Sequence, residues 1–346
     1  MMLETGPGEM RPLPLVSAVI PTHNRPQLIL RAVGSVLCQT YTNIEIVVVI
    51  DGTDPATLES LSTVKDPRLR VIVLEEPVGG SEARNCGVRE SCGKWIALLD
   101  DDDEWREDKI AKQLEVAEAA QSPYILVFSN TKVQFLDSVV VLPRRPLRAG
   151  EPISEYLFRR KGLSFGDGLL QTSSFFASRT MFDEVPFRKG LKLFQDTDWL
   201  LRADAHPQAR IEVIPEPLVT YYMDRQQSVS RNPDWKYLYN WAHENRQLFT
   251  ERAFSFFLAT ACVPRAAKLR EPIRVFLKLL RECAFGGSPT FNCLVICFVY
   301  WFIPGSLRRN FRETIWKWRG WASVSGNRRQ EAKSIEASSD KSRNRA

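Results

Sequence analysis

The chain is expected to be an α/β protein in which helices cover both faces of a mostly parallel sheet, with further helices after it. Two observations predict this class. Short apolar segments alternate with helical segments over the first hundred residues, and such βαβ alternation produces parallel sheets. From residue 235 to about 284, aromatic and aliphatic residues recur in a helical pattern. The 346 residues, 44% of them hydrophobic and 25% charged, supply enough apolar area for a large core.

Four apolar runs in the first hundred residues are the candidate strands. Near-continuous apolar runs are typical of strands that are buried on both faces. They are residues 15–20 (LVSAVI), 44–50 (IEIVVVI), 69–74 (LRVIVL) and 95–99 (WIALL). Helices are expected between them at 26–39 and 55–64, and a loop with a short helix at 79–93. This order predicts a doubly wound, Rossmann-like sheet.

Beyond residue 124 the expected elements are more mixed. Strands are expected at 124–135, 169–178, 211–214 and 218–223, and helices at 151–160 and from Asp196 onward. The sequence therefore divides into five expected regions. They are a flexible N-terminus (1–14), an α/β domain (15–230), a helical extension (231–290), an apolar and basic segment (291–322) and a disordered basic tail (323–346).

Four consecutive aspartates, Asp100 to Asp103, follow the strand expected at 95–99. Ligands of open α/β sheets bind at this end of the strands. If the chain stays extended, Asp100 and Asp102 lie on one side, and Asp101 and Asp103 on the other. Converging carboxylates raise one another's pKa unless a cation lies between them, and Mg²⁺ or Mn²⁺ commonly combines one or two carboxylates with substrate phosphates. The cluster therefore predicts a metal-diphosphate site.

The alternative for these aspartates is structural. A solvated acidic turn would cap the helix expected from Trp105 to about Gln121, with Asp103 or Glu104 at its N-cap. Carboxylates favour a helix N-terminus without any ligand. Both interpretations stay open, and the buried strand in front of the cluster favours the ligand site.

Charge, cysteines and the N-terminus argue against several classes of protein. The net charge is +6, but residues 305–346 alone contain 11 Lys/Arg and 4 Asp/Glu, so the remainder is nearly neutral and does not indicate a nucleic-acid-binding core. The seven cysteines are scattered through apolar segments, as reduced thiols are, and no CxxC pair or Cys/His cluster suggests zinc. The stretch MMLETGPGEMRPLP lacks the apolar core of a signal peptide or anchor, so we expect a cytosolic location.

Two common phosphate-binding motifs are absent from the sequence. No GxGxxG follows the first apolar run, which argues against the usual dinucleotide-binding unit. The stretch from Gly87 to Lys94 has five residues between its glycines and Trp95 after the lysine, so it is not a Walker A loop. Both common nucleotide-binding folds are disfavoured.

Five separated motifs together resemble the family 2 glycosyltransferases of GT-A fold. In order they are VSAVIPTHNRP, IVVVIDGTD, GGSEARNCG, LLDDDDEW and FQDTDWLLR, within residues 15–223. Each motif alone is weak, and their order and spacing make the combination specific. The resemblance implies a GT-A domain at 15–230, a nucleotide-diphospho-sugar donor, a divalent metal ion (Mg²⁺ or Mn²⁺) and transfer to an acceptor hydroxyl with inversion.

The resemblance also implies roles for individual residues. Asp100 and Asp102 look like the family's DxD metal-binding pair, with Asp103 as a close neighbour, and Asp196 looks like the catalytic base. Gln195 stands where Glu is common, which puts an auxiliary role of that position in doubt. The implied nucleotide-sugar-binding residues are Pro21, Thr22, Asn24, Arg25, Asp51, Arg84, Asp100 and Asp101.

Structural roles are the alternatives for several of these residues. Asp51, which the resemblance places at the nucleotide base, could instead cap the helix at 55–64. Arg84, in a loop that the resemblance places at the donor, could serve only as a counter-ion of the acidic cluster. Asp196 and Asp198 could be capping acids of the helix expected there.

The most apolar stretch, residues 291–303 (FNCLVICFVYWFI), is shorter than the roughly 20 residues of a spanning helix. Basic and indole side chains are interleaved in the following segment, from Arg308 to Trp321, a combination that suits an anionic membrane interface. We expect peripheral contact, interfacial or re-entrant, with the cytoplasmic face of a membrane. The alternative is a buried helix with a solvated basic tail.

The favoured hypothesis is a hexosyltransferase-like enzyme of cell-surface polysaccharide or glycolipid synthesis. Its expected partners are a nucleotide-diphospho-sugar and a glycan or lipid-linked acceptor, with no nucleic acid. The alternative is a non-catalytic nucleotide-sugar-binding or membrane-scaffold protein of the same fold. A sugar-phosphate nucleotidylyltransferase fits less well, because it would want a Gly-rich basic loop where this chain has PTHNRP.

Overall fold

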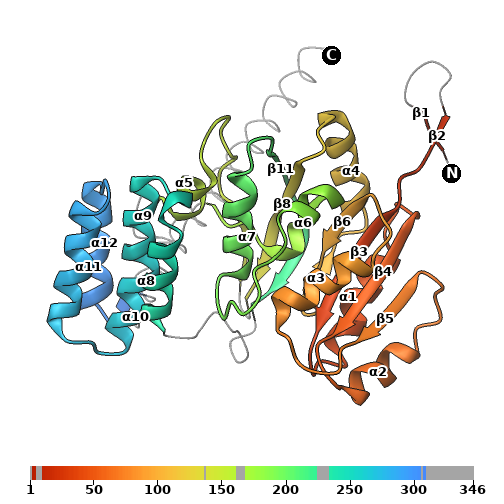
Figure 1. The fold of residues 1–346 in the computed structure, drawn as a ribbon, viewed down its shortest axis with the longest axis horizontal. Coiled ribbons are helices and arrows are strands. Elements are labelled where there is room, and N and C mark those ends of the chain that lie inside the picture. Colours follow the sequence, from red (N-terminus) through yellow and green to blue (C-terminus); the bar gives the residue numbers. More distant parts are fainter. Residues whose placement is uncertain are drawn as a thin grey trace, which may run out of the picture.

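A mixed sheet of nine strands forms one side of the molecule, and a bundle of helices forms the other (Figure 1). The computed structural model describes residues 2–4, 10–135, 138–160, 168–223, 234–304 and 307–308. The strand order is β5-β4-β3-β6-β10-β8-β11-β7, and β9 pairs with β8. The α/β class with a helical C-terminal extension is therefore confirmed.

The first half of the sheet consists of the four strands expected from the apolar runs. They are β3 (Val16–Thr22), β4 (Ile44–Ile50), β5 (Leu69–Val73) and β6 (Trp95–Leu98). β3 pairs in parallel with β4 and β6, and β4 pairs in parallel with β5. β3 is longer than expected, because Pro21 and Thr22 continue its register opposite Val49 and Ile50. The start of the PTHNRP turn thus belongs to the carboxyl edge of the sheet.

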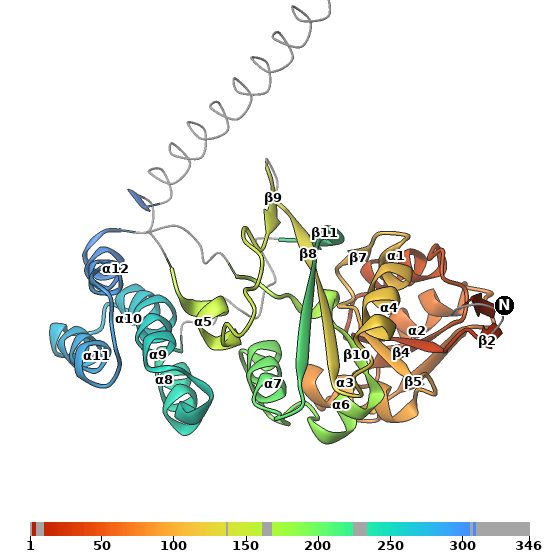
Figure 2. The same cartoon turned by 90° about the horizontal axis from the view of Figure 1, so that it is seen from above.

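Helices cover both faces of the sheet, as expected (Figure 2). β3 shows the division, since Ala18 and Ile20 belong to the core on one face and Val19 to the core on the other. The first face is covered by α1 (Leu28–Leu37), α2 (Pro55–Ser62) and α4 (Lys109–Ala120). The second face is covered by α3 (Gly80–Glu90), α6 (Arg179–Glu184) and α7 (Gln195–Asp204).

Antiparallel pairing enters the sheet in its second half. β10 (Phe176–Ser178) lies antiparallel between β6 and β8 (Ile125–Gln134). β11 (Arg210–Tyr222) is parallel to β8, whereas β9 (Val139–Leu142) pairs antiparallel with β8. The edge strand β7 (Glu104–Trp105) pairs antiparallel with β11. The turn between β6 and β7 contains Asp100 to Asp103, and we call it the acidic turn. It connects the centre of the sheet directly to its edge.

Two expected strand regions differ in extent. Of residues 169–178 only the last three form a strand, because a 3₁₀ turn, η1 (Thr172–Ser174), precedes them. The strands expected at 211–214 and 218–223 are one continuous strand, β11. Shifts of register on either side of Pro217 accommodate the prolines within it.

The helix expected from Trp105 begins later, at Lys109. Glu104 and Trp105 are extended instead, because they pair with Thr220 and Val219 of β11. The residue that precedes α4 is Asp108, so the expected capping of this helix by Asp103 or Glu104 is wrong. A solvated capping turn therefore does not account for the aspartates.

The C-terminal bundle packs against α7. Trp241 Nε1 donates to Asp198 Oδ1 at 3.0 Å, and the ring centroids of Phe194 and Phe257 are 5.7 Å apart. Asp198 is fully buried and also pairs with Arg188 and Arg202, so it joins α7 to the bundle rather than capping a helix. The bundle contains α8 (Trp235–Glu244), η3 (Arg246–Leu248), α9 (Glu251–Phe257), the π-turn η4 (Leu258–Cys262), α10 (Val263–Lys268), α11 (Ile273–Phe285) and α12 (Phe291–Phe302), with α5 (Ile153–Phe158) against α9.

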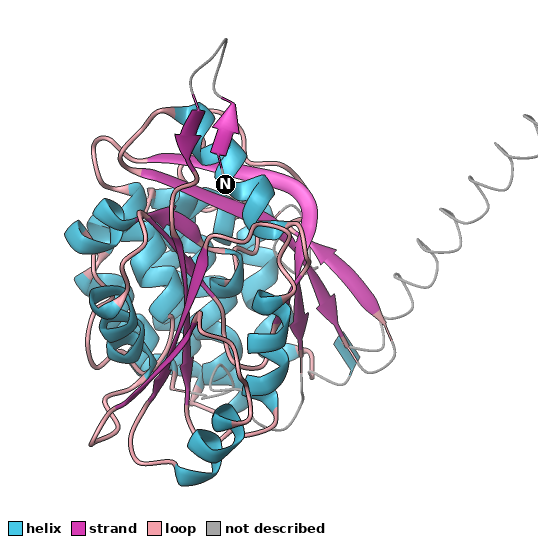
Figure 3. Cartoon of the chain, turned by 90° about the vertical axis from the view of Figure 1, so that its right-hand side faces the viewer, coloured by secondary structure: helices cyan, strands magenta, loops and turns pink. Residues whose placement is uncertain are grey.

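The N-terminal residues expected to be flexible contain two strands, β1 (Met2–Glu4) and β2 (Met10–Pro12), which pair only with each other (Figure 3). At the other end, α12 covers most of the apolar stretch. The basic and indole-rich residues 309–321 and the tail expected at 323–346 lie outside the described residues. No helix in the described ranges has both the length and the apolar character to cross a bilayer.

Gly87 sets how closely α3 approaches the sheet. A Cβ at this position would overlap with Val19 Cγ1 of β3 and lie 3.2 Å from Val49 Cγ2 of β4. Gly87→Ala is expected to lower the free energy of unfolding by about 1–3 kcal/mol, because the added carbon overpacks a closed core. Urea denaturation measures the change.

Gly34 in α1 is the matched control, since a Cβ there meets no atom within 4 Å. Gly34→Ala is expected to stabilise the protein by about 0.5–1 kcal/mol through helix propensity. Equal effects of the two substitutions would contradict the close approach of α3.

Candidate active site

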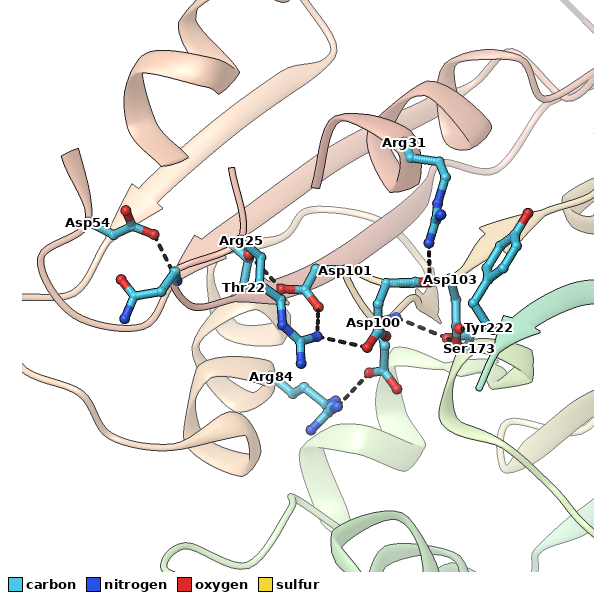
Figure 4. Close-up of polar contacts among 12 residues, drawn as sticks. Thr22, Arg25, Arg31, Asp54, Arg84, Asp100, Asp101, Asp103, Ser173 and Tyr222 are labelled. Atoms are coloured by element: carbon cyan, nitrogen blue, oxygen red, sulfur yellow. Dashed lines mark hydrogen bonds and ion pairs between the residues drawn. The ribbon is translucent and has the colours of Figure 1, made fainter. Parts of the chain in front are cut away.

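The acidic turn that follows β6 is the centre of the candidate site (Figure 4). Exposure alternates along it, since Asp101 and Asp103 are buried. The side chains of Asp100 and Asp102 are 23% and 33% exposed. Asp100 and Asp102 are therefore the two carboxylates that a ligand can reach.

Asp103, the last aspartate of the acidic turn, fixes the turn to the neighbouring segments through its buried side chain. Its fully buried carboxylate accepts hydrogen bonds from Ser173 Oγ at 2.6 Å and from Gln171 Nε2. Ser173 Oγ also accepts the backbone N–H of Asp100 at 3.0 Å. The backbone N–H of Tyr222 donates to the other Asp103 oxygen at 3.4 Å. The η1 segment and β11 thus hold the turn from two sides.

Thr22, the last residue of β3, and Arg25, in the turn after β3, also contact the acidic turn (Figure 4). The Arg25 guanidinium lies 2.7 Å from Asp101 and 2.8 Å from Asp102. Thr22 Oγ1 donates to the second oxygen of Asp101 at 2.7 Å. Both carboxylate oxygens of Asp101 are therefore engaged by protein groups. Asp102 contacts Arg25 through Oδ2, and its side chain stays 33% exposed.

Arg84 of α3 links the acidic turn to α7. One of its nitrogens lies 2.5 Å from Asp100 Oδ1, and another donates to Gln195 Oε1 at 3.1 Å. Gln195 is the first residue of α7. The side-chain amide of Gln195 thus accepts a hydrogen bond from Arg84, which also pairs with Asp100.

Crowding and burial raise the pKa values of the aspartates. Burial, followed by the charges of Asp100 and Asp101, raises the pKa of Asp102 to about 6 despite the opposing charge of Arg25. Burial raises the pKa of Asp101 as well, and it raises the pKa of Asp103 well above the usual aspartate range. Added positive charge beside the turn would relieve this repulsion.

Asp100 and Asp102 could provide some, but not all, of the ligands of a divalent cation. Asp100 and Asp102 offer partly exposed oxygens, and their mutual repulsion favours a cation. In the part of the chain that the structure describes, no cluster of three or more His, Cys, Asp or Glu side chains is arranged to hold a metal ion. Ligands from a substrate would have to complete the coordination, as diphosphate oxygens commonly do for Mg²⁺.

Asp196 lies in the first turn of α7, next to Gln195. It is not the N-cap, because the helix begins one residue earlier, after Phe194 in a left-handed conformation. Its carboxylate accepts the backbone N–H of Thr197 at 2.7 Å. Burial, with a further contribution from the charge of Asp100, raises the pKa of Asp196. This aspartate is thus electrostatically coupled to the acidic turn.

Asp51 and Asn24 shape the neighbouring loops. The Asp51 carboxylate accepts the backbone N–H groups of Val78 at 2.6 Å and Gly79 at 2.9 Å, which fixes the loop before α3. Asn24 has a positive φ of 53°, and its backbone N–H donates to Asp54 at 2.8 Å. Asp54, not Asp51, accepts the N-terminal hydrogen bond of α2, so the expected alternative of a cap at Asp51 is wrong.

Residues 17–178 match the model of the family described as glycosyl transferase family 2. A relative from Escherichia coli strain K12, WcaA, which is named for colanic acid biosynthesis, is 31% identical over 195 residues, covering 56% of this chain and 67% of the relative. The chain is a family 2 glycosyltransferase. The resemblance found in the five motifs is therefore confirmed.

A second relative matches a shorter part of this glycosyltransferase. The Escherichia coli protein WfaP, named UDP-Glc:α-D-GlcNAc-diphosphoundecaprenol β-1,3-glucosyltransferase, is 38% identical over 104 residues. The match covers 30% of this chain and 41% of that relative. It therefore spans less than half of WfaP.

A solved structure supports the fold of the glycosyltransferase. Residues 1–349 of S. aureus TarS, crystallised with UDP-GlcNAc, superpose with a TM-score of 0.55 at 15% identity, covering 86% of this chain and 92% of that one. At this identity the likeness concerns the fold alone. The expected GT-A fold is thereby confirmed.

Several residues around the candidate site were not expected from the sequence. Tyr221 of β11 is among them, because burial and the charges of the nearby aspartates of the acidic turn and of Asp196 raise its pKa. Arg31 of α1 donates to the backbone carbonyl of Asp102 at 2.5 Å and lies 4.0 Å over the Tyr222 ring. The sequence indicated a strand at 218–223 but not its pairing with β7, which places both tyrosines beside the acidic turn.

Ser173 is expected to contribute measurably to stability through Asp103. Ser173→Ala removes a donor to a buried carboxylate and an acceptor for the Asp100 N–H, which should cost about 1–3 kcal/mol. Urea denaturation near neutral pH measures the loss.

Ser174→Ala is the matched control, because among the described residues its buried hydroxyl makes one local hydrogen bond, to the carbonyl of Gln171 at 2.7 Å. The control should cost about 1 kcal/mol or less. A smaller loss for Ser173→Ala than for Ser174→Ala would argue against the anchoring role of Asp103.

Proposed function

We propose that this chain is an inverting enzyme that moves a sugar from a nucleotide-diphospho-sugar to an acceptor hydroxyl in the synthesis of a cell-surface polysaccharide or glycolipid. The observation that carries the proposal is the connection Asp100–Arg84–Gln195. It joins the exposed carboxylates at the end of β6 to the helix turn that holds Asp196. A leaving-group site and a candidate base are thereby held in one polar network.

The donor is proposed to bind along the carboxyl edge of β3, β4 and β6, where ligands of open α/β sheets lie. Pro21 and Thr22 end β3, and Asn24 and Arg25 form the turn after it. Asp51, at the end of β4, fixes the loop that leads to Arg84 of α3 and is proposed to approach the nucleotide base. Asp100 completes the proposed donor site, and Asp101 is proposed to support it by holding Arg25 and Thr22.

Arg84 and Arg25 are proposed to orient the diphosphate. Guanidinium groups suit phosphate oxygens because they donate in a planar fork. Both arginines now pair with carboxylates of the acidic turn, Arg84 with Asp100 and Arg25 with Asp101 and Asp102. An incoming diphosphate would take up donors from these existing ion pairs.

Asp100 and Asp102 are proposed to hold Mg²⁺ or Mn²⁺ together with diphosphate oxygens. The raised pKa of Asp102 and the partial exposure of both carboxylates support this role. A divalent ion bound there would supply Lewis-acid stabilisation of the charge on the leaving diphosphate. Asp101 and Asp103, which are occupied by protein donors, are proposed to position the turn.

Asp196 is proposed to be the catalytic base. Its carboxylate would accept the proton of the acceptor hydroxyl as the hydroxyl oxygen bonds to the anomeric carbon and the bond from that carbon to the diphosphate breaks. Attack from the face opposite the leaving group inverts the anomeric centre. The raised pKa of Asp196, caused mainly by burial, strengthens the carboxylate as a proton acceptor.

The acceptor is proposed to be a glycan or a lipid-linked sugar at the cytoplasmic face of a membrane. The name of WfaP describes a diphosphoundecaprenol-linked acceptor for that relative. The apolar α12 and the basic, indole-rich sequence after it support peripheral contact with a membrane. Residues 1–304 have a nearly neutral net charge, which supports a function without nucleic acid.

Isothermal titration with UDP-, GDP- and dTDP-sugars, each with Mn²⁺ and with chelator, tests the donor site. Metal-dependent binding of one nucleotide class is expected. Asp102→Asn should weaken that binding by at least about tenfold, because it removes an anionic oxygen of the proposed metal site. Absence of binding by any sugar nucleotide to the folded wild type would favour a non-catalytic role.

Asp66→Asn is the control for the loss of one carboxylate. Asp66 pairs with Arg68 between α2 and β5, outside the acidic turn. The control should bind the donor like the wild type. A similar loss in both variants would indicate a general effect of net charge and argue against a specific role of Asp102.

Asp196→Asn is expected to lower kcat by about 10²–10⁴-fold with donor binding retained, because the amide cannot accept the proton. In the wild type, activity should fall as the pH is lowered through a pKa above the usual aspartate value, since only the carboxylate is active and its pKa is raised. Steady-state rates across pH measure both effects.

Asp183→Asn, at an exposed position of α6, is the control for Asp196→Asn. It should retain the wild-type rate and pH profile. Turnover by Asp196→Asn at the wild-type rate would sink the assignment of the base and leave the donor site standing.

A further inference from the structure

α11 and α12 are the outermost helices of the bundle, at the end of the molecule away from β5 (Figures 1 and 2). Both expose large apolar side chains to solvent. Phe291 is 81% exposed, and Phe302, Leu277, Ile273 and Phe298 are between 47% and 58% exposed. Exposed apolar groups of this size on one side of a protein mark an interaction surface.

Four of these side chains are grouped by the contacts given below, and Phe291 lies on the same side of α12 as Phe298, two helical turns before it. We call these five side chains the α11–α12 apolar face. Ile273 and Leu277 are one turn apart on α11. Phe298 and Phe302 are one turn apart on α12, with stacked rings 6.2 Å apart. Phe276 joins the two pairs, because its ring centroid lies 5.3 Å from each of these rings.

Basic side chains border the α11–α12 apolar face. Arg274, Lys278 and Arg281 are all exposed on α11. The single acidic residue of α11, Glu282, accepts hydrogen bonds from Tyr239 at 2.5 Å and pairs with His243 at 2.8 Å in the bundle. Lys278 Nζ also lies 4.3 Å from the centroid of the Tyr239 ring. The exposed charged side chains of α11 are therefore the cations Arg274, Lys278 and Arg281.

We propose that the α11–α12 apolar face docks on an anionic lipid bilayer, with both helices lying in the plane of the interface. The inference rests on the proposed function for its membrane setting and extends it to α11, which the sequence assigned to the helical extension. Phenylalanine and leucine on one side of a helix with arginine and lysine on the other is the pattern of interfacial helices.

Two further observations favour a bilayer as the partner. Anionic headgroups complement Arg274, Lys278 and Arg281, whereas a second copy docked through the same face would bring like charges together. The sequence after α12 continues with basic residues and with Trp316, Trp318 and Trp321, a composition that is enriched at lipid interfaces.

Flotation of the full-length protein with vesicles tests the proposal. Binding is expected to vesicles of phosphatidylcholine with phosphatidylglycerol, to weaken with salt, and to be much weaker with phosphatidylcholine alone. Arg274→Gln with Lys278→Gln should lower partitioning by about fivefold for each charge removed. Leu277→Gln with Phe291→Gln should lower it by about tenfold.

Leu58→Gln and Lys65→Gln are the matched controls, since both residues are exposed at the opposite end of the molecule. They should bind vesicles like the wild type. Thermal unfolding of each variant verifies that the bundle is folded, and sugar-nucleotide titration of the same samples reports on the donor site independently.

Unchanged vesicle binding in both pairs of α11 and α12 variants would overturn the proposal. Concentration-dependent self-association that Leu277→Gln with Phe291→Gln abolishes would also overturn it, because the face would then join two copies. Failure of every variant and of the wild type to bind sugar nucleotides would overturn the proposed function and leave the vesicle result intact.

Discussion

The site depends on the burial of Asp103 beneath three further aspartates. A carboxylate without exposure needs donors, and Ser173, Gln171 and the Tyr222 N–H provide them. This requirement explains why the chain leaves the strand conformation before β10. The η1 turn presents Ser173 to both Asp103 and the Asp100 N–H. Local backbone structure thus follows from a polar group that must be satisfied.

The bundle has a similar effect on α7. Asp198 is fully buried, and it binds Arg188, Arg202 and the indole of Trp241. A buried carboxylate with this many partners gives the helix one preferred position, because each displacement would leave a charged group unpaired. Asp196 is two residues away in the same helix. The C-terminal bundle therefore helps to place the proposed base opposite the acidic turn.

The sequence predicted the parts of this arrangement that have a local signature. Burial on both faces leaves continuous apolar runs, so β4 was expected with its observed bounds, and the aspartates were expected at the end of β6. Contacts between distant segments have no such signature. Arg84 meets Gln195 across 111 residues, and β7 is a two-residue strand that exists only through β11. From the sequence, Asp198 could only be interpreted as a capping acid near the start of a helix. Its partners Arg188 and Trp241 lie in other segments of the chain.

The close packing at Gly87 reaches beyond the core. Arg84 lies three residues before Gly87 in α3, so one helical turn separates the contact with Val19 from the guanidinium that binds Asp100. A larger residue at 87 would push the helix off the sheet and carry the arginine with it. A substitution at Gly87, which lies in the core, would therefore also disturb the contact between Arg84 and Asp100 at the edge of the sheet. Any redesign of the proposed donor site would have to keep glycine at position 87.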